Sequence, residues 1–229
     1  MNTLIRKLYH HPFLAAIMHT LVHELQKELH DCKSVIDLGC GPNSPLQYCP
    51  WIEDSIGVEA FVPYLEQSRA KNIHTEYLNA RLETLDFPDK SVDAVILIDV
   101  LEHLPEELGY QILEKTERWA RKKVIVSSPN GFIEQSALDD NELQKHLSGW
   151  DYARMKSLGF RCRGMAGPKW LRQEVDGGTM GDDLLVSIRF RPRALWFVMS
   201  TLLQPITFFI PCVAFSLFSR KMIIRERCH

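Results

Sequence analysis

The chain has 229 residues, of which 45% are hydrophobic and 24% are charged, and its formal net charge is −2. That length allows one α/β domain with a full hydrophobic core, and the composition is that of an ordinary globular protein. The small net charge excludes a general electrostatic attraction to nucleic acid or to anionic lipid. Six cysteines occur without a C-x-x-C pair, which argues against a zinc site or a disulfide framework and predicts a cytoplasmic protein.

The first predicted element is an amphipathic helix between Pro12 and His30. A proline is suited to the first turn of a helix. We expect residues 1–30 to form an N-terminal helical segment that packs on the core. Its apolar residues recur at helical intervals, at Leu14, Ile17, Met18, Leu21, Val22, Leu25 and Leu29.

A short strand and a glycine turn are predicted next. Residues 34–38 form a mainly apolar run that contains Asp37 and leads into Gly39-Cys40-Gly41. Glycines allow the backbone to turn sharply and let a ligand approach it without meeting a Cβ atom. A second apolar strand ends at Glu59, at about the 20-residue spacing by which a βαβ unit places an acid against a ribose.

Strands and helices alternate along the chain that follows. Residues 92–98 are an almost continuous apolar run, typical of a central strand that is buried on both faces. The alternation predicts a parallel, doubly wound sheet that binds ligands at the carboxyl ends of its strands. Further strands are expected at 74–78 and 124–127, and helices at 63–71, 105–122 and 148–159.

Five motifs between Asp37 and Gly131 resemble those of the class I S-adenosylmethionine-dependent methyltransferases. They are Asp37-Leu38-Gly39-Cys40-Gly41-Pro42, Gly57-Val58-Glu59-Ala60, the run from Leu85 to Asp93, Asp99-Val100-Leu101-Glu102-His103-Leu104, and Ser128-Pro129-Asn130-Gly131. The resemblance implies a Rossmann-like, seven-stranded, mostly parallel sheet over residues 31–192. Strands at 160–164 and 184–190 would supply the antiparallel hairpin that closes it.

The resemblance also implies S-adenosylmethionine as the cofactor. Asp37 is then expected near its amino end, and Glu59 is expected to accept hydrogen bonds from both ribose hydroxyls. No acid follows the third strand at the adenine position, so adenine contacts are expected from backbone groups of Arg81 and Leu82. The cofactor-binding residues predicted are Asp37, Gly39, Cys40, Gly41, Glu59, Ala60, Arg81, Leu82 and Asp99.

The segment from Asp99 to His103 is expected nearest the transferred methyl group. An acid followed by a Glu-His pair resembles the site of family members that hold a divalent ion with a more distant histidine, for which His146 is the candidate. Asp99 stands where those relatives have glutamate. Three roles remain open for Glu102, His103 and His146: metal ligands, a general base at His103 or His146, or a structural role.

The C-terminal segment, residues 193–229, contains an uncharged run from Ala194 to Ser219 with arginines before and after it. The run is long enough to span a bilayer. Gln204, Pro205 and Pro211 lie inside it, and an internal proline interrupts a helix. The pattern therefore favours two short apolar helices in an extension of the domain. Contact with the cytoplasmic face of a membrane, with the domain or with a second subunit remains open.

The resulting hypothesis is a methyltransferase that acts on an oxygen of a small or lipid-linked acceptor. A nicotinamide-dependent oxidoreductase is the first alternative, and Ser44 disfavours it because a dinucleotide loop carries glycine there. The second alternative is a catalytically silent, membrane-associated protein that binds the cofactor. Nucleic acid is not an expected partner, because the basic residues lack an interleaved aromatic platform.

Overall fold

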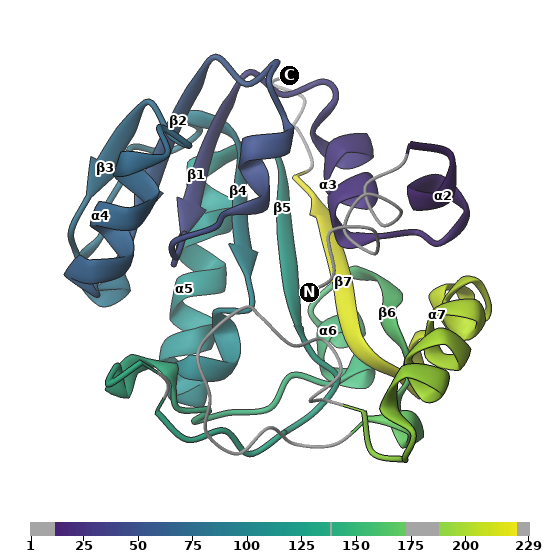
Figure 1. The fold of residues 1–229 in the computed structure, drawn as a ribbon. Helices are drawn as coiled ribbons and strands as arrows, with labels where there is room; N and C mark the ends of the chain where they lie inside the picture. The colour runs from purple at the N-terminus through teal and green to yellow at the C-terminus, as the bar shows by residue number, and fades with distance from the viewer. Residues whose placement is uncertain (1–11, 138, 173–187, 224–229) are drawn as a thin grey trace.

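In the computed structural model, which describes residues 12–137, 139–172 and 188–223, the chain folds around one seven-stranded sheet (Figure 1). The strand order is β3-β2-β1-β4-β5-β7-β6. Strands β1 to β5 run parallel, and β7 is antiparallel to both of its neighbours. The strands are β1 (Ser34–Leu38), β2 (Asp54–Val58), β3 (Glu76–Leu78), β4 (Val92–Ile98), β5 (Ala120–Pro129), β6 (Arg161–Pro168) and β7 (Ala214–Met222). This is the predicted doubly wound, mostly parallel sheet.

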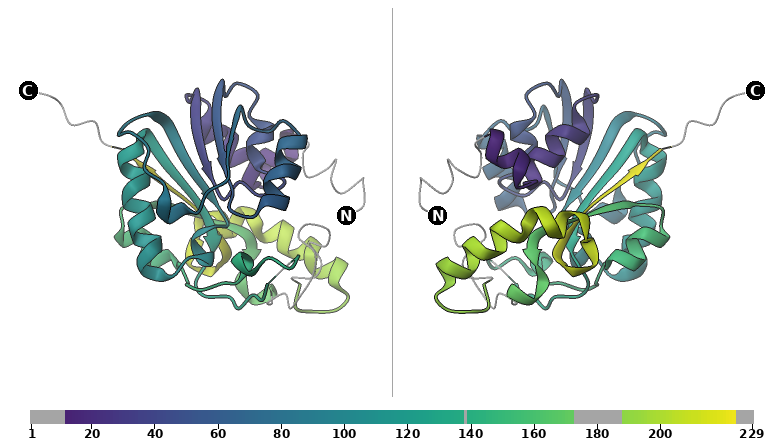
Figure 2. Two further views of the ribbon diagram at one scale, coloured as in Figure 1. Left: turned by 90° about the vertical axis from the view of Figure 1, so that its left-hand side faces the viewer. Right: turned by 90° about the vertical axis from the view of Figure 1, so that its right-hand side faces the viewer.

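Helices cover both faces of this sheet, as the side views show (Figure 2). The helices are α2 (Pro12–Ile17), α3 (Leu21–Leu29), α4 (Val62–Ala70), α5 (Glu106–Trp119), α6 (Tyr152–Ser157) and α7 (Arg193–Phe209). Between the sheet and its helices lie two hydrophobic cores. One core joins β1, β4 and β5 to Ile112 and Leu113 of α5 and to Met155 of α6. The other contains Leu25 of α3 and Phe208 of α7.

The predicted N-terminal helix is in fact two helices. The break falls at His19, whose φ of +47° no helical residue adopts, and Thr20 caps the new helix by accepting a hydrogen bond from His23 N. His19 is held in this conformation because its Nδ1 contacts the buried Glu24 Oε1 at 2.7 Å and its ring stacks on Phe208. Periodicity could not show the break, because the apolar spacing runs through it.

Two helix ends also differ from the prediction. Helix α5 ends at Trp119, because the segment from Ala120 onwards already pairs with β4. Helix α6 begins after Asp151, whose carboxylate accepts a hydrogen bond from Arg154 N, and not at Ser148. Gly159, with a φ of +83°, ends α6 as expected.

The C-terminal half of the uncharged run was assigned wrongly. Residues 193–209 form α7, which continues through Pro205, but residues 214–222 form β7 between β5 and β6. They are therefore a strand of the sheet, whereas the sequence pattern placed them in a helical extension. Of the expected strand at 184–190, residues 184–187 lie outside the described residues, and Ile188 makes an isolated bridge to Arg172. No helix in the described part of the chain is long and apolar enough to cross a membrane.

Candidate functional site

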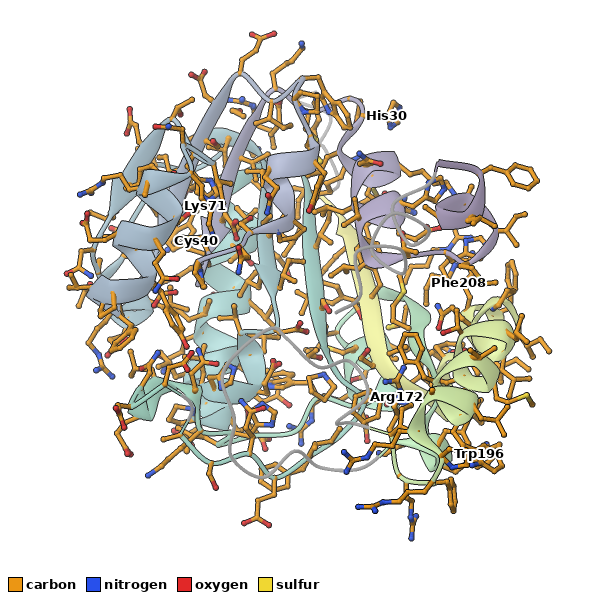
Figure 3. The ribbon with its side chains drawn as sticks, viewed as in Figure 1. His30, Cys40, Lys71, Arg172, Trp196 and Phe208 are labelled. Atoms are coloured by element: carbon orange, nitrogen blue, oxygen red, sulfur yellow. The ribbon has the colours of Figure 1, made fainter. Side chains whose placement is uncertain are left out.

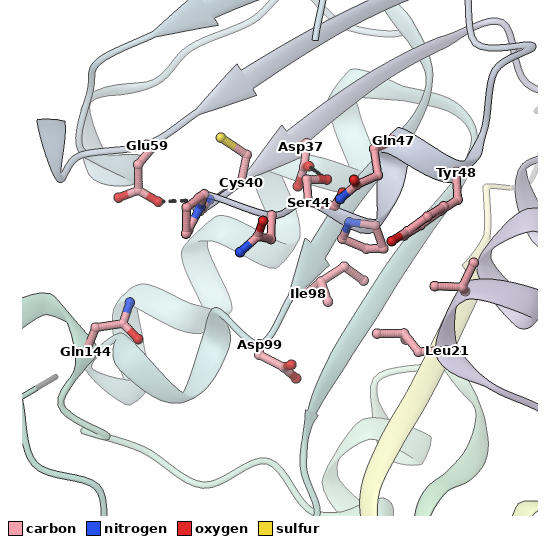
Figure 4. Close-up of a pocket in the computed structure, with 16 residues that line it drawn as sticks. Leu21, Asp37, Cys40, Ser44, Gln47, Tyr48, Glu59, Ile98, Asp99 and Gln144 are labelled. Carbon is pink, nitrogen blue, oxygen red and sulfur yellow. Dashed lines mark hydrogen bonds between the residues drawn. The ribbon is translucent and has the colours of Figure 1, made fainter. Parts of the chain in front are cut away.

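A crevice of about 540 Å³ opens at the carboxyl ends of β1, β2 and β4 (Figure 4). The glycine turn after β1 forms one wall, and Glu59 follows β2 while Asp99 follows β4. Because parallel strands end at one edge of the sheet, residues far apart in sequence meet there. Six of the nine predicted cofactor residues line this crevice: Asp37, Gly39, Cys40, Gly41, Glu59 and Asp99.

The glycine turn has the backbone that its sequence requires. Gly39 and Gly41 have φ values of +65° and +54°, in the left-handed region that favours glycine. A Cβ atom on Gly39 would lie 2.7 Å from Cγ2 of Val100, whereas a Cβ atom on Gly41 would meet nothing within 4 Å. Gly39 thus allows close packing against the segment after β4, and Gly41 leaves the wall of the crevice open.

Asp37 lies at the base of the crevice and is almost fully buried. Its Oδ2 accepts a hydrogen bond of 2.5 Å from Ser44 Oγ. Burial, and to a smaller extent the nearby Glu59, raise the pKa of this carboxyl to about 7, against the lowering effect of Ser44. His74 Nε2 lies 3.5 Å from Asp37 Oδ2, but burial lowers the pKa of His74 to about 4, so the neutral imidazole gives no ion pair at neutral pH.

Glu59 is held with both carboxylate oxygens in defined positions. Oε2 accepts a hydrogen bond from Gly41 N at 3.1 Å, and Oε1 accepts one from Phe61 N at 2.8 Å. Burial raises the pKa of Glu59, and the backbone donors oppose this shift. Since a carboxylate oxygen has two lone pairs, each oxygen can accept one more hydrogen bond, from two neighbouring hydroxyls for example.

A second cavity, of about 360 Å³, adjoins the crevice and shares Gly39, Glu59, Asp99 and Gln144 with it. Ala60, Arg81 and Leu82, the remaining predicted cofactor residues, line this cavity. Their side of the cavity is fixed by Asn79, whose Nδ2 donates to the carbonyl oxygens of Glu59 and Ala60. All nine predicted cofactor residues therefore line one of two connected cavities.

The crevice has a strongly acidic lining. Its carboxyl groups belong to Asp37, Glu59 and Asp99, and no lysine or arginine is among the described residues that line it. Water cannot fully solvate these carboxylates, because Asp37 and Glu59 are buried. Such a lining favours a positively charged ligand and disfavours a phosphate-bearing one.

Asp99 lies where the cavities meet. It has a φ of +55°, and its backbone N and its Oδ1 are held by the carbonyl and hydroxyl groups of Ser127, each at 2.9 Å. The Asp99 side chain is exposed to the crevice, but the walls of the crevice surround it and partly desolvate its carboxyl group. This desolvation raises the pKa of Asp99, against the lowering effects of Ser127 and His146. The strained backbone and the hydrogen bond aim the carboxylate into the space between the cavities.

Glu102, His103 and His146 come together as their spacing suggested. One ligand atom from each lies within 4.8 Å of the others, and the two imidazole centroids are 4.8 Å apart. His103 Nδ1 and His146 Nδ1 lie 3.2 and 2.6 Å from the carbonyl oxygens of Lys145 and Ile133. A carbonyl only accepts, so each Nδ1 carries the proton and each Nε2 keeps a lone pair.

The protonation of this group limits its chemistry. Burial lowers the pKa of His103 to about 4 and also lowers that of His146, so both imidazoles are neutral near pH 7. Burial raises the pKa of Glu102 well above its ordinary value, and Asp99 adds to the shift. The three residues could hold a divalent ion only if Glu102 lost its proton. His103 also lines the second cavity. Asp99, although it lines the same cavity, is not one of the three clustered ligand residues.

A third cavity, of about 310 Å³, meets the crevice at Leu21 and Asp99. It lies between the start of α3, β6, β7 and the inner side of α7. Most of its surface is apolar, and several polar groups in it already bond within the protein, among them Ser127, Ser200 and Gln204. Its apolar lining includes Met18, Leu21, Met165, Phe197 and Phe215.

The sequence reading missed two residues that support the crevice. Ser44 was noted only because it is not glycine, yet its hydroxyl bonds to Asp37. His74 fills the space beside Gly57, where a Cβ atom would lie 2.4 Å from the imidazole. The signal for His74 was present in the glycine of β2, because a strand glycine often marks close approach of another group.

Comparison with known proteins identifies a domain of this chain and its fold. Residues 36–127 match the sequence model of a methyltransferase domain family. The methyltransferase domain of bacterial CtHen1 is 18% identical, with 91% of this chain and 100% of that chain covered at a TM-score of 0.53. No curated protein matches the sequence.

Two further solved structures have the same fold. A SAM-dependent methyltransferase from Archaeoglobus fulgidus is 16% identical, with 93% of this chain and 99% of that chain covered at a TM-score of 0.50. The plantazolicin methyltransferase BpumL, solved in complex with SAH, is 14% identical, with 96% and 87% covered at a TM-score of 0.52. The fold is thus that of the Rossmann-like methyltransferases. The matched domain model, together with the five motifs, supports a class I S-adenosylmethionine-dependent methyltransferase.

Proposed function

We propose that the chain binds S-adenosylmethionine across the crevice and the second cavity and transfers its methyl group to an oxygen of a small or lipid-linked acceptor. The acidic lining of the crevice carries this proposal. Asp37, Glu59 and Asp99 offer three carboxyl groups with no cation among the described lining residues. The cofactor brings a sulfonium and an ammonium group, so its charge complements these residues, and its sulfonium makes the methyl group electrophilic.

The placement of the cofactor follows from the hydrogen bonds that remain available. The free lone pairs of Glu59 suit a ribose diol, because Gly41 N and Phe61 N already fix both oxygens. Asp37 then lies on the side of the amino acid moiety. Arg81 and Leu82 line the far cavity, where the adenine fits against the backbone. Each residue in this arrangement positions the donor and excludes water from it.

The acceptor is proposed to enter through the third cavity. This cavity meets the crevice at Asp99 and is mainly apolar, which suits an acceptor with a hydrocarbon or ring portion. Polar groups that already bond within the protein cannot anchor a strongly hydrated ligand. The acceptor atom would reach the methyl group near Asp99, where the three cavities meet.

A hydroxyl nucleophile must lose a proton during the reaction, and His103 is the proposed base for such an acceptor. Its Nε2 has a lone pair, because Nδ1 is bonded to a carbonyl oxygen, and the depressed pKa keeps the ring neutral. His146, whose ring is tilted by 59° to that of His103 at a centroid distance of 4.8 Å, can take the same role or orient His103. A nicotinamide cofactor is a poor match, since its pyrophosphate would lie among carboxylates.

Transfer of an isotope-labelled methyl group tests the proposal. The chain is incubated with labelled S-adenosylmethionine and either a lipid extract or a water-soluble metabolite extract, and products are separated by phase. We expect label in one acceptor, in an ether or ester bond, and much less label with Glu59→Gln at a cofactor concentration that does not saturate the wild type. Label on nitrogen or carbon would refute the oxygen acceptor, and failure of the chain to take up S-adenosylmethionine would refute the cofactor assignment.

A further inference from the structure

Helix α7 has its polar and apolar sides reversed relative to an ordinary surface helix. Surface helices of globular proteins turn their apolar side to the core. In α7 the buried positions include Ser200, Gln204 and Thr207, while the outward positions are apolar. Leu202 and Ile206 are 58% and 57% exposed. The other exposed apolar residues of α7 are Leu195, Val198, Met199 and Phe209.

The polar side faces inward because it bonds to the backbone of β6. Gln204 Oε1 accepts from Gly167 N at 2.7 Å, and its Nε2 donates to Gly164 O at 3.1 Å. Ser200 Oγ donates to Ala166 O. Glycine is needed at Gly164 because a Cβ atom there would lie 2.1 Å from the carbonyl oxygen of Thr207. These contacts fix the rotation of α7, so its apolar side must face outward.

The exposed apolar surface extends beyond α7. Phe13 and Ile17 of α2 are also exposed, and His19, just after α2, stacks on Phe208 at 3.7 Å, which ties the two helices together. In Figure 3 the side chains that project outward from α7 consist mainly of carbon. We call this surface the apolar face: Phe13, Ile17, Leu195, Val198, Met199, Leu202, Ile206, Phe209, Ile210 and Val213.

Positive charge lies at the edge of the apolar face. Arg189 and Arg191 are exposed just before α7, and Arg193 is its first residue. The sequence has no charged residue between Arg193 and Arg220. A second copy related by twofold symmetry would bring the same arginines to this face, and none of the described residues of the face is acidic. An anionic lipid surface offers both an apolar layer and the opposite charge.

We propose that the apolar face docks onto an anionic phospholipid bilayer, with α7 lying in the plane of the interface and the arginines at the headgroups. The inner side of α7 lines the third cavity, through Phe197, Ser200, Thr201 and Gln204. Docking would therefore bring that cavity beside the lipid, which favours a lipid-linked acceptor. Only this last consequence rests on the proposed function; the docking itself does not.

Co-sedimentation of the full chain with vesicles tests the proposal without any cofactor or acceptor. We expect binding to vesicles of phosphatidylglycerol and phosphatidylcholine and much weaker binding to phosphatidylcholine alone. Leu202→Glu and Ile206→Glu should each weaken binding roughly tenfold or more, because each loses an inserted apolar side chain. Arg191→Gln should weaken it about fivefold, since a cation near such a surface contributes about 1 kcal/mol.

Val62→Glu on α4 is the matched control, because Val62 is 51% exposed but lies outside the apolar face. It should bind vesicles as the wild type does, and circular dichroism should show all four variants folded. The proposal would be overturned if the wild type did not bind vesicles, or if Leu202→Glu and Ile206→Glu bound them as tightly as the wild type does. A wild-type dimer that ignores vesicles and becomes monomeric on Leu202→Glu would do so as well, since a second copy would then cover this face.

Discussion

Replacing Glu59 with glutamine should sharply weaken binding of S-adenosylmethionine while the fold is kept. The glutamine has the same shape, and its carbonyl oxygen can still accept the hydrogen bond from Phe61 N. Its amide nitrogen would face Gly41 N, so two donors meet where the native carboxylate accepts at 3.1 Å. The substitution therefore removes the charge and one acceptor and disturbs the glycine turn.

The magnitude follows from the hydrogen bonds to the ribose. A hydrogen bond to a charged group contributes about 1.5–3 kcal/mol. Glutamine loses one of two such bonds and leaves the other as a weaker neutral bond, so we expect a loss of about 2–4 kcal/mol. That corresponds to an affinity roughly 30- to 1000-fold lower. The net cost to folding should be small, because release from burying a carboxylate offsets the hydrogen bond that Gly41 N loses.

Isothermal titration calorimetry with S-adenosylhomocysteine measures this effect without turnover. Glu83→Gln is the matched control: Glu83 lines the same second cavity, but its carboxylate pairs with Arg81 and is partly exposed. A partly exposed ion pair contributes about 0–1 kcal/mol, so the control should change affinity by less than about fivefold. If Glu59→Gln binds as tightly as the control, the assignment of the ribose position is wrong.

Three further predictions concern the same site. Affinity for S-adenosylmethionine should rise by at most about tenfold per pH unit up to about pH 7 and then level off. The reason is that the bound cation lowers the raised pKa of Asp37 and so favours its ionised form. Asp37→Asn should flatten the profile, and a flat wild-type profile would contradict this prediction. Gly39→Ala should lower the free energy of unfolding in urea by about 2–4 kcal/mol, from the left-handed backbone and the 2.7 Å contact with Val100, whereas Gly41→Ala should cost about 1–2 kcal/mol; equal losses would contradict it. His103→Gln should slow methyl transfer to an oxygen acceptor by about 100-fold or more while cofactor affinity is kept, and an unchanged rate would exclude His103 as the base.

The parallel half of the fold was predictable from sequence because local pattern and tertiary role agree there. Residues 92–98 were expected as a central strand and form β4, with six of seven positions buried. Residues 34–38 likewise form β1, followed by the two glycines of positive φ. The site residues came with the strands, because their positions just after the strand ends place them at one edge of the sheet.

The C-terminal part was less predictable for a physical reason. Residues 214–222 are paired on both sides, so their apolar character reflects burial within a sheet and not helical packing. A short apolar run does not distinguish these two cases. Similarly, Ser44 supports Asp37 through a side-chain hydrogen bond that no local pattern encodes.

Equilibrium titration of the wild-type chain with S-adenosylmethionine and, separately, with NAD tests the central claim most directly. The acidic crevice predicts one S-adenosylmethionine bound per chain, displaced by S-adenosylhomocysteine, and no heat of binding with NAD. Binding of NAD, or of neither molecule, would contradict the claim that the carboxylates of Asp37 and Glu59 receive a positively charged methyl donor.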